Sequence, residues 1–321
     1  MSINTDMAVR VTAITQVAET VKRFRLERAD GKPMPVFSGG AHVVVAMRDS
    51  AILRRNPYSL MSPPTDTAGY EISVLRVEQS RGGSAFMHEK VEAGASLSIS
   101  QPVNLFPFDL RGKKHLLLAG GIGITPFMAM MDQMAREGRA FELHYAVRSR
   151  SHGAYWKDLV ARYGAQRVKI YCDAEKHFIP VDALLSGQPL GTHLYVCGPA
   201  GMIDGVLGKA TAMGWPAQNL HSERFLAPPT GKPFAAKLHR SGKTITVGSH
   251  QSILEAVEAA GIDAPFLCRG GACGQCETTV ISCDGTLEHN DHYLEPDDKS
   301  SGRKIMICVS RLKGHEITLD L

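Results

Sequence analysis

The sequence predicts a multidomain chain: an antiparallel β-barrel, an α/β domain on a parallel sheet, and an α+β domain. Three observations support this. Short β-rich segments fill the first third, strands alternate with helical stretches in the middle, and a cysteine-rich loop follows a proline-rich break. The 321 residues also exceed one core, since domains usually have roughly 100–200 residues. We place the domains at 1–111, 112–226 and 236–321, with a linker at 227–235.

Each predicted domain has its own local pattern. "AHVVVAM", "YEISVLRV" and "SLSISQPV" are β-branched or alternating and are separated by turn residues, which is typical of an antiparallel barrel or sandwich. From about residue 112, "KKHLLLAGG", the helix-like "TPFMAMMDQMAREG", "FELHYAVRS" and "RVKIYCD" alternate as βαβ units do. "FLAPPTGKPF" is the linker, "AAKLHRSGKTITV" a hairpin and "SILEAVEAAG" a short helix.

Composition excludes several classes of protein. Apolar residues make up 44% and charged residues 21%, as in ordinary globular proteins, and a net charge of +4 is too small to imply nucleic acid. No run of 18 or more apolar residues occurs, and "MSINTDMAVR" lacks the apolar core of a signal peptide. We therefore expect a cytoplasmic monomer that binds neither membrane nor nucleic acid.

The cysteines indicate an iron–sulfur cluster. "CRGGACGQC" gives Cys268, Cys273 and Cys276 the C-x4-C-x2-C spacing of plant-type [2Fe-2S] proteins, and Cys308 in "MICVSR" supplies a fourth thiolate. The loop glycines allow close approach of the backbone to the sulfides. Zinc sites usually use two C-x2-C pairs, and only one is present. Cys283 in "VISCDG" is an alternative fourth ligand, but its strand-to-turn position makes it less favoured than Cys308.

Two glycine-rich turns indicate a nucleotide site. "LLLAGGIGITPF" places Gly121 and Gly123 between a strand and a helix, where backbone N–H groups can meet a pyrophosphate, although Pro126 stands where G-x-G-x-x-G has its last glycine. "YVCGPAGM" ends a later strand at Cys197 and Gly198. In a doubly wound sheet two such strand ends can border one crevice, which we favour over a pair of plain tight turns.

A nucleotide site and a cluster together require a flavin. A nicotinamide gives up two electrons as a hydride, whereas a [2Fe-2S] cluster accepts one electron. A carrier that accepts two and releases one must connect them, and flavins do so. We therefore expect a flavin in the N-terminal barrel.

The stretch "RRNPYSL" departs from the usual flavin-binding pattern. Many flavin reductases carry Arg-x-Tyr-Ser, but here Asn56 lies two positions before Tyr58 and Arg55 is one step earlier. Pro57 fixes its own φ and donates no N–H, so either the strand shifts and Arg55 reaches the flavin phosphate, or Asn56 replaces it as a neutral donor. We prefer Arg55, because a guanidinium matches a dianion better than an amide does.

The chain resembles the phthalate dioxygenase reductase family, which includes vanillate O-demethylase reductases. The resemblance spans essentially the whole chain and is carried by "YSL", "RGGS", "AGGIGITP", "YVCGP", "HSERF", "CRGGACGQC", "CVSR" and the terminal "LDL". It implies an FMN-binding β-barrel, an NADH domain and a C-terminal plant-type ferredoxin domain of β-grasp fold. This domain order is itself characteristic of the family.

The resemblance also implies site residues. Ser59 resembles the residue near the flavin N5, Thr125 the residue beside both flavin and nicotinamide, and Phe225 the aromatic that covers the ring; we assign these three to the site of hydride transfer. "RGGS" resembles the FMN phosphate loop, where bare N–H groups and a hydroxyl suit a phosphate. The implied flavin set is Arg55, Asn56, Tyr58, Ser59, Val74, Leu75, Arg76, Gly82, Gly83, Ser84 and Phe225.

For the nicotinamide nucleotide the implied set is Gly121, Thr125, Arg148, Asp173, Cys197, Gly198, Pro199 and Met202. Asp173 ends a strand, and a carboxylate there accepts from a ribose 2′-OH and repels a 2′-phosphate, which favours NADH; Arg148 and Arg150 favour NADPH.

Three further side chains raise questions. We interpret Glu223 as an orienting group, because hydride transfer depends on positioning and not on an acid–base pair. We interpret His289 and His292 as residues of a solvated loop.

These inferences predict an NADH-dependent reductase that passes electrons through FMN and a [2Fe-2S] cluster to a Rieske-type oxygenase, for ring dihydroxylation or O-demethylation. One alternative is an FAD-dependent reductase of a diiron monooxygenase, which mostly has its ferredoxin domain first. Another is a non-catalytic redox sensor, which predicts a degenerate nicotinamide crevice, whereas "GGIGITP" and "YVCGP" are intact.

Overall fold

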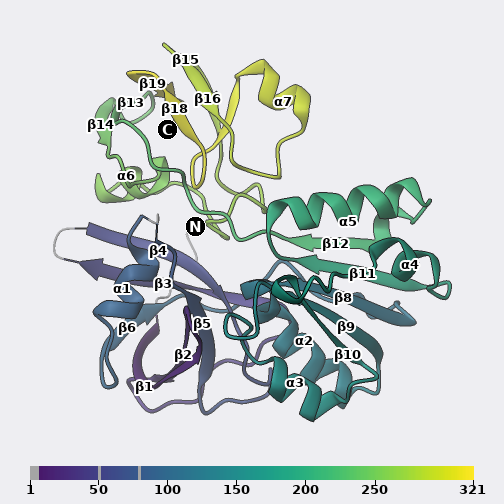
Figure 1. The fold of residues 1–321 in the computed structure, drawn as a ribbon. Coiled ribbons are helices and arrows are strands. Elements are labelled where there is room, and N and C mark those ends of the chain that lie inside the picture. Colours follow the sequence, from purple (N-terminus) through teal and green to yellow (C-terminus); the bar gives the residue numbers. More distant parts are fainter. Residues whose placement is uncertain (1–6, 50–51, 79–80) are drawn as a thin grey trace.

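The computed structural model describes residues 7–49, 52–78 and 81–321. Three larger sheets succeed one another along the chain (Figure 1), and a two-stranded sheet of β16 and β18 accompanies the last. Each larger sheet packs against a hydrophobic core, and the core of the parallel sheet also includes Val21 and Met61 of the barrel domain. Our domain limits remain a prediction, and the first strand of the last sheet begins at Phe234, inside the expected linker.

The N-terminal sheet is antiparallel, as predicted. Its elements are β1 (Met7–Ala18), β2 (Val21–Arg28), β3 (Ala41–Asp49), β4 (Ile52–Ser59), β5 (Tyr70–Leu75), α1 (Gly83–Glu89), β6 (Ser96–Ile99) and β7 (Val103–Asn104). The strand order is β4-β3-β6-β1-β2-β5, with β7 paired to β3. Helix α1 contacts β3, β4 and β5, so it closes the barrel between the two end strands of this path.

Alternate side chains of β3 point into the barrel. Val43, Val45 and Met47 are buried inside the barrel, in one cluster with Met87 of α1. Val44 and Ala46 point the other way, because successive side chains of a strand face opposite sides. Residues directly opposite in an antiparallel pair share a face. In the partner strand β4, Asn56 therefore shares the face of Val45, and Arg55 shares the face of Ala46.

The middle domain is a parallel sheet covered by helices on both faces. It contains β8 (Lys114–Gly120), α2 (Thr125–Arg136), β9 (Ala140–Val147), α3 (Trp156–Tyr163), β10 (Val168–Cys172), α4 (Val181–Ser186), β11 (Thr192–Cys197), α5 (Ala200–Ala212) and β12 (Leu220–Glu223). The order β10-β9-β8-β11-β12 reverses between β8 and β11. A crevice for a ligand forms at such a reversal, outside the carboxyl ends of the strands.

The C-terminal domain is a mixed α+β unit. It contains β13 (Phe234–Leu238), β14 (Lys243–Val247), α6 (Ile253–Ala259), β15 (Glu277–Cys283), β16 (Thr286–Glu288), α7 (Pro296–Ser301), β17 (Lys304–Met306), β18 (Arg311–Lys313) and β19 (Glu316–Leu319). The predicted hairpin is β13 paired with β14, and the predicted helix is α6. Ser252 and Glu255 form a capping box that fixes where α6 begins.

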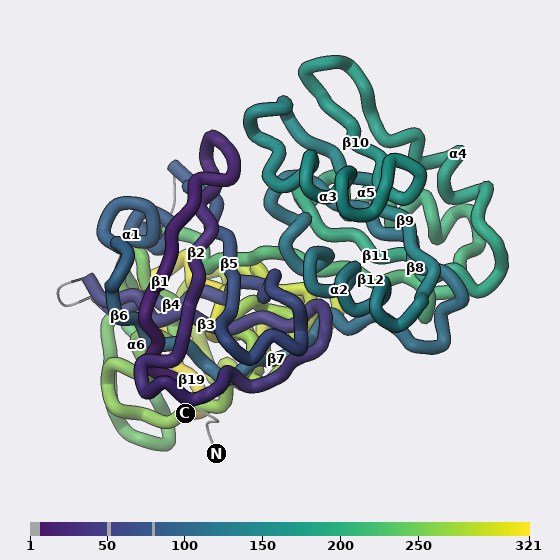
Figure 2. The backbone as a smooth tube through the Cα atoms, turned by 90° about the horizontal axis from the view of Figure 1, so that it is seen from below, coloured from purple at the N-terminus to yellow at the C-terminus, as the bar shows by residue number. Residues whose placement is uncertain are grey.

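The three domains meet around one region. The barrel and the parallel sheet lie side by side, and the C-terminal domain lies over the barrel with α6 facing it (Figures 1 and 2). Ser73 of β5 shares a hydrogen bond of 2.6 Å with Tyr155, and the Gly39 amide donates to Gln133 Oε1 at 2.8 Å. Among the helices of the described residues, none is long and apolar enough to cross a membrane.

Candidate functional site: one cavity between three domains

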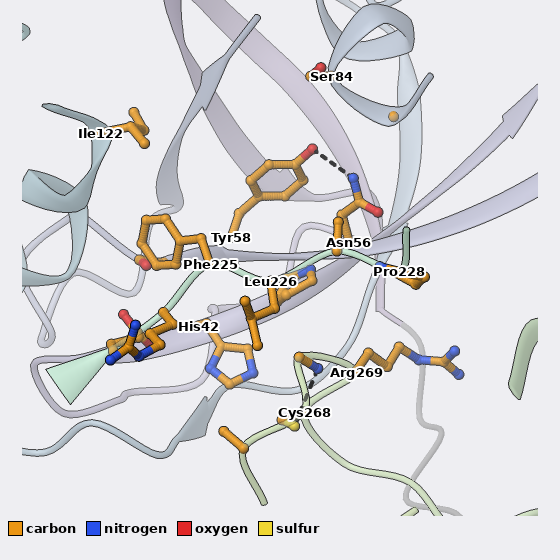
Figure 3. Close-up of a pocket in the computed structure, with 18 of the residues that line it drawn as sticks. His42, Asn56, Tyr58, Ser84, Ile122, Phe225, Leu226, Pro228, Cys268 and Arg269 are labelled. Carbon is orange, nitrogen blue, oxygen red and sulfur yellow. Dashed lines mark hydrogen bonds between the residues drawn. The ribbon is translucent and has the colours of Figure 1, made fainter. Parts of the chain in front are cut away.

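A cavity of about 710 Å³ lies where the three domains meet (Figure 3). Its walls come from β4 and the "RGGS" turn, from Ile122 and Thr125 after β8, from the end of β12, from the linker and from the cysteine loop. Among the described lining residues, none comes from the glycine turn after β11. This volume is within the range of about 300–1,000 Å³ found for ligand sites. Two buried polar atoms in its wall, His42 Nε2 and Glu223 Oε2, have no hydrogen-bond partner among the residues that the structure describes, as expected of a site built to receive a polar group.

Strand β4 supplies the wall on the barrel side. Tyr58 and Ser59 line the cavity at the end of the strand. Burial raises the pKa of Tyr58 to about 12, so the phenol is neutral near pH 7. Asn56, two residues earlier and therefore on the same face, donates from Nδ2 to the Tyr58 hydroxyl at 3.4 Å. Tyr58 and Asn56 thus form one polar edge, visible in Figure 3.

The "RGGS" turn lies against this edge. Gly82 has a φ of 97°, which only glycine adopts readily, and it precedes α1. A Cβ on Gly83 would lie 2.4 Å from Asn56 Nδ2, so the turn and the Asn56 side chain fit together only without a side chain at this glycine. Ser84 lines the cavity, and its Oγ accepts from the Val77 amide at 3.2 Å. Backbone amides beside a hydroxyl suit a phosphate group.

Arg55 makes a different contact from the one we expected. Its Nη1 lies 3.2 Å from Glu258 Oε2 of α6, in the C-terminal domain. Asn56 is the side chain that packs on the predicted phosphate loop. Both side chains line the cavity, so our preference for Arg55 over Asn56 as the phosphate ligand stays a prediction.

The end of β5 lines the cavity with alternate residues. These are Ser73, Leu75 and, just after the strand, Val77. The Val74 carbonyl accepts from His88 Nε2 at 2.8 Å, and Arg76 is held by Glu89 at 2.6 Å. Neither Val74 nor Arg76 is among the lining residues that the structure describes.

The two glycine turns of the parallel sheet meet as predicted. A Cβ on Gly123 would lie 2.3 Å from the Cys197 carbonyl oxygen, and one on Gly120 would lie 2.7 Å from Pro199 and Met202. The backbones therefore approach each other closely at the ends of β8 and β11, where the strand order reverses. Thr125 begins α2 at this point, is buried, and donates to the Ile122 carbonyl at 3.0 Å.

Charged side chains flank the far end of this crevice. Asp173 is exposed directly after β10, and Arg148 is exposed directly after the adjacent β9. Arg150 binds Glu175 through two hydrogen bonds of 2.7 and 2.8 Å and lies 4.9 Å from the centre of the Trp156 ring. Its charge is therefore neutralised within the protein, which weakens the argument for a 2′-phosphate.

Glu223 and Phe225 close the cavity on the nucleotide side. Burial raises the pKa of Glu223 to about 8, so this carboxyl is mainly protonated at pH 7 and can donate a hydrogen bond. The Phe225 ring lines the cavity and is 47% exposed, which is what a movable cover over a planar ligand requires.

The four predicted cluster cysteines converge. Cys268 is within hydrogen-bond reach of Cys273 and Cys308, and Cys276 of Cys308; these contacts lower the pKa of Cys268 and raise that of Cys308. The Gly270 amide donates to Cys268 Sγ at 3.3 Å. Cys283 is exposed, and its thiol donates a hydrogen bond to the Gly285 carbonyl on its own turn. This place agrees with our preference for Cys308 as the fourth ligand.

The cysteine arrangement suits a two-iron cluster. Across the described residues, no three His, Cys, Asp or Glu side chains gather as a single metal ion requires. A [2Fe-2S] cluster divides four thiolates between two irons, so the thiols need not meet at one point. Cys268 lines the cavity, which brings the cluster site to the edge of the flavin site.

Sequence reasoning missed several residues of the cavity. His42 is buried on β3 opposite Ser59 and, like Arg81 and Arg269, lines the cavity. We expected both His289 and His292 in a solvated loop. His292 is exposed at the cavity rim, as expected, but the His289 side chain is only 10% exposed. No local pattern marks these residues, because their places depend on how the domains pack.

Comparisons with known proteins agree with this geometry. The family model for the 2Fe-2S iron-sulfur cluster binding domain matches residues 236–313, and that for the N-terminal domain of dimethylamine monooxygenase subunit DmmA-like proteins matches residues 99–220. The first match confirms the ferredoxin domain.

Relatives match along the whole chain. The carnitine monooxygenase reductase subunit of Acinetobacter baumannii is 43% identical over 97% of this chain and 96% of its own. The heme-dependent oxidative N-demethylase beta subunit of Ectopseudomonas mendocina is 41% identical over 99% and 100%. The solved structure of phthalate dioxygenase reductase, described as modular for electron transfer from pyridine nucleotides to [2Fe-2S], is 33% identical with a TM-score of 0.90 over 99% and 98%. The chain therefore belongs to the phthalate dioxygenase reductase family.

Proposed function

We propose that this protein is the reductase component of an oxygenase system, carrying electrons from NADH through FMN to a [2Fe-2S] cluster and on to the oxygenase. The observation that supports this most is one cavity that is lined by the "RGGS" turn, by residues after β8 and at the end of β12, and by Cys268. All three redox groups would then meet in one place.

The barrel residues would hold FMN by its two ends. Asn56, Gly82, Gly83 and Ser84 would receive the phosphate, while Tyr58 and Ser59 would lie along the ring. Arg81, which begins the turn, is bound to Glu255 of α6 at 2.7 Å. Helix α6 therefore lies beside the phosphate loop, where the adenylate half of FAD would extend, and this supports FMN over FAD.

The nucleotide domain would present NADH to the ring. Gly121, Gly198 and Pro199 border the crevice, Thr125 lies at its inner end, and Asp173 is placed to accept from a ribose hydroxyl. When bound, the flavin accepts a hydride and releases single electrons. The protein's part is to align the two rings, to exclude water with Phe225, and to donate a hydrogen bond from Glu223.

We propose a Rieske-type oxygenase as the partner, in ring dihydroxylation or O-demethylation, reached through a transient complex with a monomeric reductase in the cytoplasm. A second candidate partner is a haem-dependent oxidative demethylase. The relative that is 41% identical and the DmmA-like match favour it. Reconstitution with one purified oxygenase of each class, scored by product formed per NADH, distinguishes the two.

The experiment that tests the redox assignment is an anaerobic titration with NADH. NADH should bleach the flavin absorbance and then that of the cluster, and the protein should reduce ferricyanide and cytochrome c. Heating should release FMN; release of FAD would overturn the flavin assignment. A flavin that NADH does not bleach would favour the redox sensor.

A further inference from the structure

Helix α6 places one carboxylate between arginines of two domains. Glu258 Oε2 lies 3.2 Å from Arg55 Nη1 of β4 and accepts from Arg269 Nη1 of the cysteine loop at 3.0 Å. Arg269 Nη2 donates to the other carboxylate oxygen. The side chains of Arg55, Glu258 and Arg269 are 17%, 14% and 4% exposed, so the group is largely shielded from water. One acidic side chain thus connects the barrel to the cysteine loop.

Arg269 transmits this connection to the cluster site. It follows Cys268 directly and has a φ of 53°, an uncommon conformation for a residue other than glycine. Its guanidinium also lies 3.9 Å from the centre of the Phe266 ring. The bonds to Glu258 therefore fix a loop residue that would otherwise relax, and with it Cys268. Of the four cluster cysteines, Cys268 is the one found among the cavity residues that the structure describes.

We propose that Glu258 is a positioning residue for electron transfer from the flavin to the cluster, acting through Arg55 and Arg269. The inference deepens the proposed function and depends on it. One electron leaves the reduced flavin and the oxidised cluster gains it; the second follows after the first has passed to the oxygenase. Glu258 touches neither redox group and contributes by holding Cys268 at the cavity edge.

Removing the negative charge should affect this step selectively. In Glu258→Gln two guanidinium groups would face each other without a counter-charge in a site shielded from water, and their repulsion would move the cysteine loop away from the barrel. Transfer to the cluster occurs only while the cysteine loop lies against the barrel, so its rate falls in proportion to the population of that arrangement. A fall of that population to about one tenth slows transfer about tenfold. Hydride transfer occurs on the other side of the cavity and should keep its rate.

Anaerobic stopped-flow reduction by NADH separates the two phases, since flavin and cluster absorb at different wavelengths. We expect the cluster phase to be about tenfold slower in Glu258→Gln, partly restored in Glu258→Asp, which keeps the charge, and slowed again in Arg269→Gln. Glu316→Gln is the matched control, because Glu316 binds Lys237 at 2.8 Å within the ferredoxin sheet.

Several results would overturn the inference. One is a cluster that is reduced in Glu258→Gln at the wild-type rate. Another is a rate of cluster reduction that is the same in Glu258→Asp as in Glu258→Gln. A third is Glu316→Gln slowing cluster reduction as much as Glu258→Gln does. Slower reduction of the flavin in Glu258→Gln, by the same factor as the cluster phase, would also overturn it. A wild-type protein in which NADH reduces no flavin would instead defeat the proposed function.

Discussion

The ion pair between Arg81 and Glu255 should hold the ferredoxin domain on the barrel. Arg81 donates to both Glu255 oxygens, at 2.7 and 3.3 Å, and to the His250 carbonyl at 3.1 Å; both side chains are 6% exposed. Breaking a buried pair from one side costs about 3–5 kcal/mol, because the remaining charge stays buried without a partner. Glu255→Gln keeps the helix cap, since glutamine also serves in a capping box. We expect it to lower the free energy of unfolding of this domain by about 3 kcal/mol.

The expected loss can be measured with urea. For a domain of this size the free energy falls by about 1.5 kcal/mol per molar urea, so the midpoint should fall by about 2 M. Visible circular dichroism of the cluster after a fixed incubation reports the ferredoxin domain. Trp156 and Trp215, the two tryptophans of the chain, both lie in the nucleotide domain and provide an internal reference.

A double-mutant cycle decides whether the pair is the cause. The double variant Arg81→Met with Glu255→Gln removes both charges. Its loss in free energy of unfolding should be about 2 kcal/mol smaller than the sum of the losses in the two single variants. Additive losses would refute the reasoning. So would a tryptophan midpoint that falls together with the cluster midpoint, because the effect would then not be confined to the docked domain.

Four further predictions follow from single contacts. Gly83→Ala should weaken FMN binding roughly tenfold, because the added methyl would displace Asn56; unchanged retention in equilibrium dialysis would contradict this. Flavin reduction by NADH should slow as pH rises through about 8, where the raised pKa of Glu223 lets it lose its proton, and Glu223→Gln should show no such step. Burial lowers the pKa of His221 to about 4 in the folded protein, whereas in the unfolded chain it is near 6.5. The neutral imidazole therefore contributes stability that is fully present above about pH 6.5. That stability is lost as pH falls toward 4, and thermal melts of His221→Phe should show a shallower decline over this range. Cys283→Ser should leave iron content and the visible spectrum unchanged; a loss of either would make it a ligand.

Features that depend on neighbours in sequence could be predicted well. The cysteine loop is nine residues long, so its spacing alone indicates the cluster. The hairpin of β13 and β14 and the start of α6 at its capping box are likewise local. The parallel sheet follows from alternation of strands and helices, and its crevice follows from glycines at the ends of β8 and β11.

Features that depend on domain packing could not be predicted. Arg81 and Glu255 are 174 residues apart, and Arg55 and Glu258 are 203 apart. No periodicity in one segment indicates which charge of another will face it. His42 looks like an ordinary strand residue until β4 and the cysteine loop are placed around it.

The displaced arginine of "RRNPYSL" has a physical explanation in the alternation of β4. Arg54 and Asn56 share one face of the strand: Arg54 lies against Gly82 and donates to the Arg81 carbonyl at 2.5 Å, and Asn56 lies against Gly83. Arg55 pairs in register with Ala46, whose side chain points away from the barrel interior, and both line a second cavity of about 160 Å³ with Phe266 and Arg269.

An arginine two positions before Tyr58 would share the face of the phosphate loop, because side chains on a strand repeat every two residues. One position earlier, Arg55 lies on the other face with Pro57 and Ser59, where it still lines the cavity and also pairs with Glu258 of the ferredoxin domain. The strand therefore need not shift to recover a phosphate ligand. We infer that the charge is used instead to hold the domain that receives the electrons, while a neutral amide remains beside the phosphate.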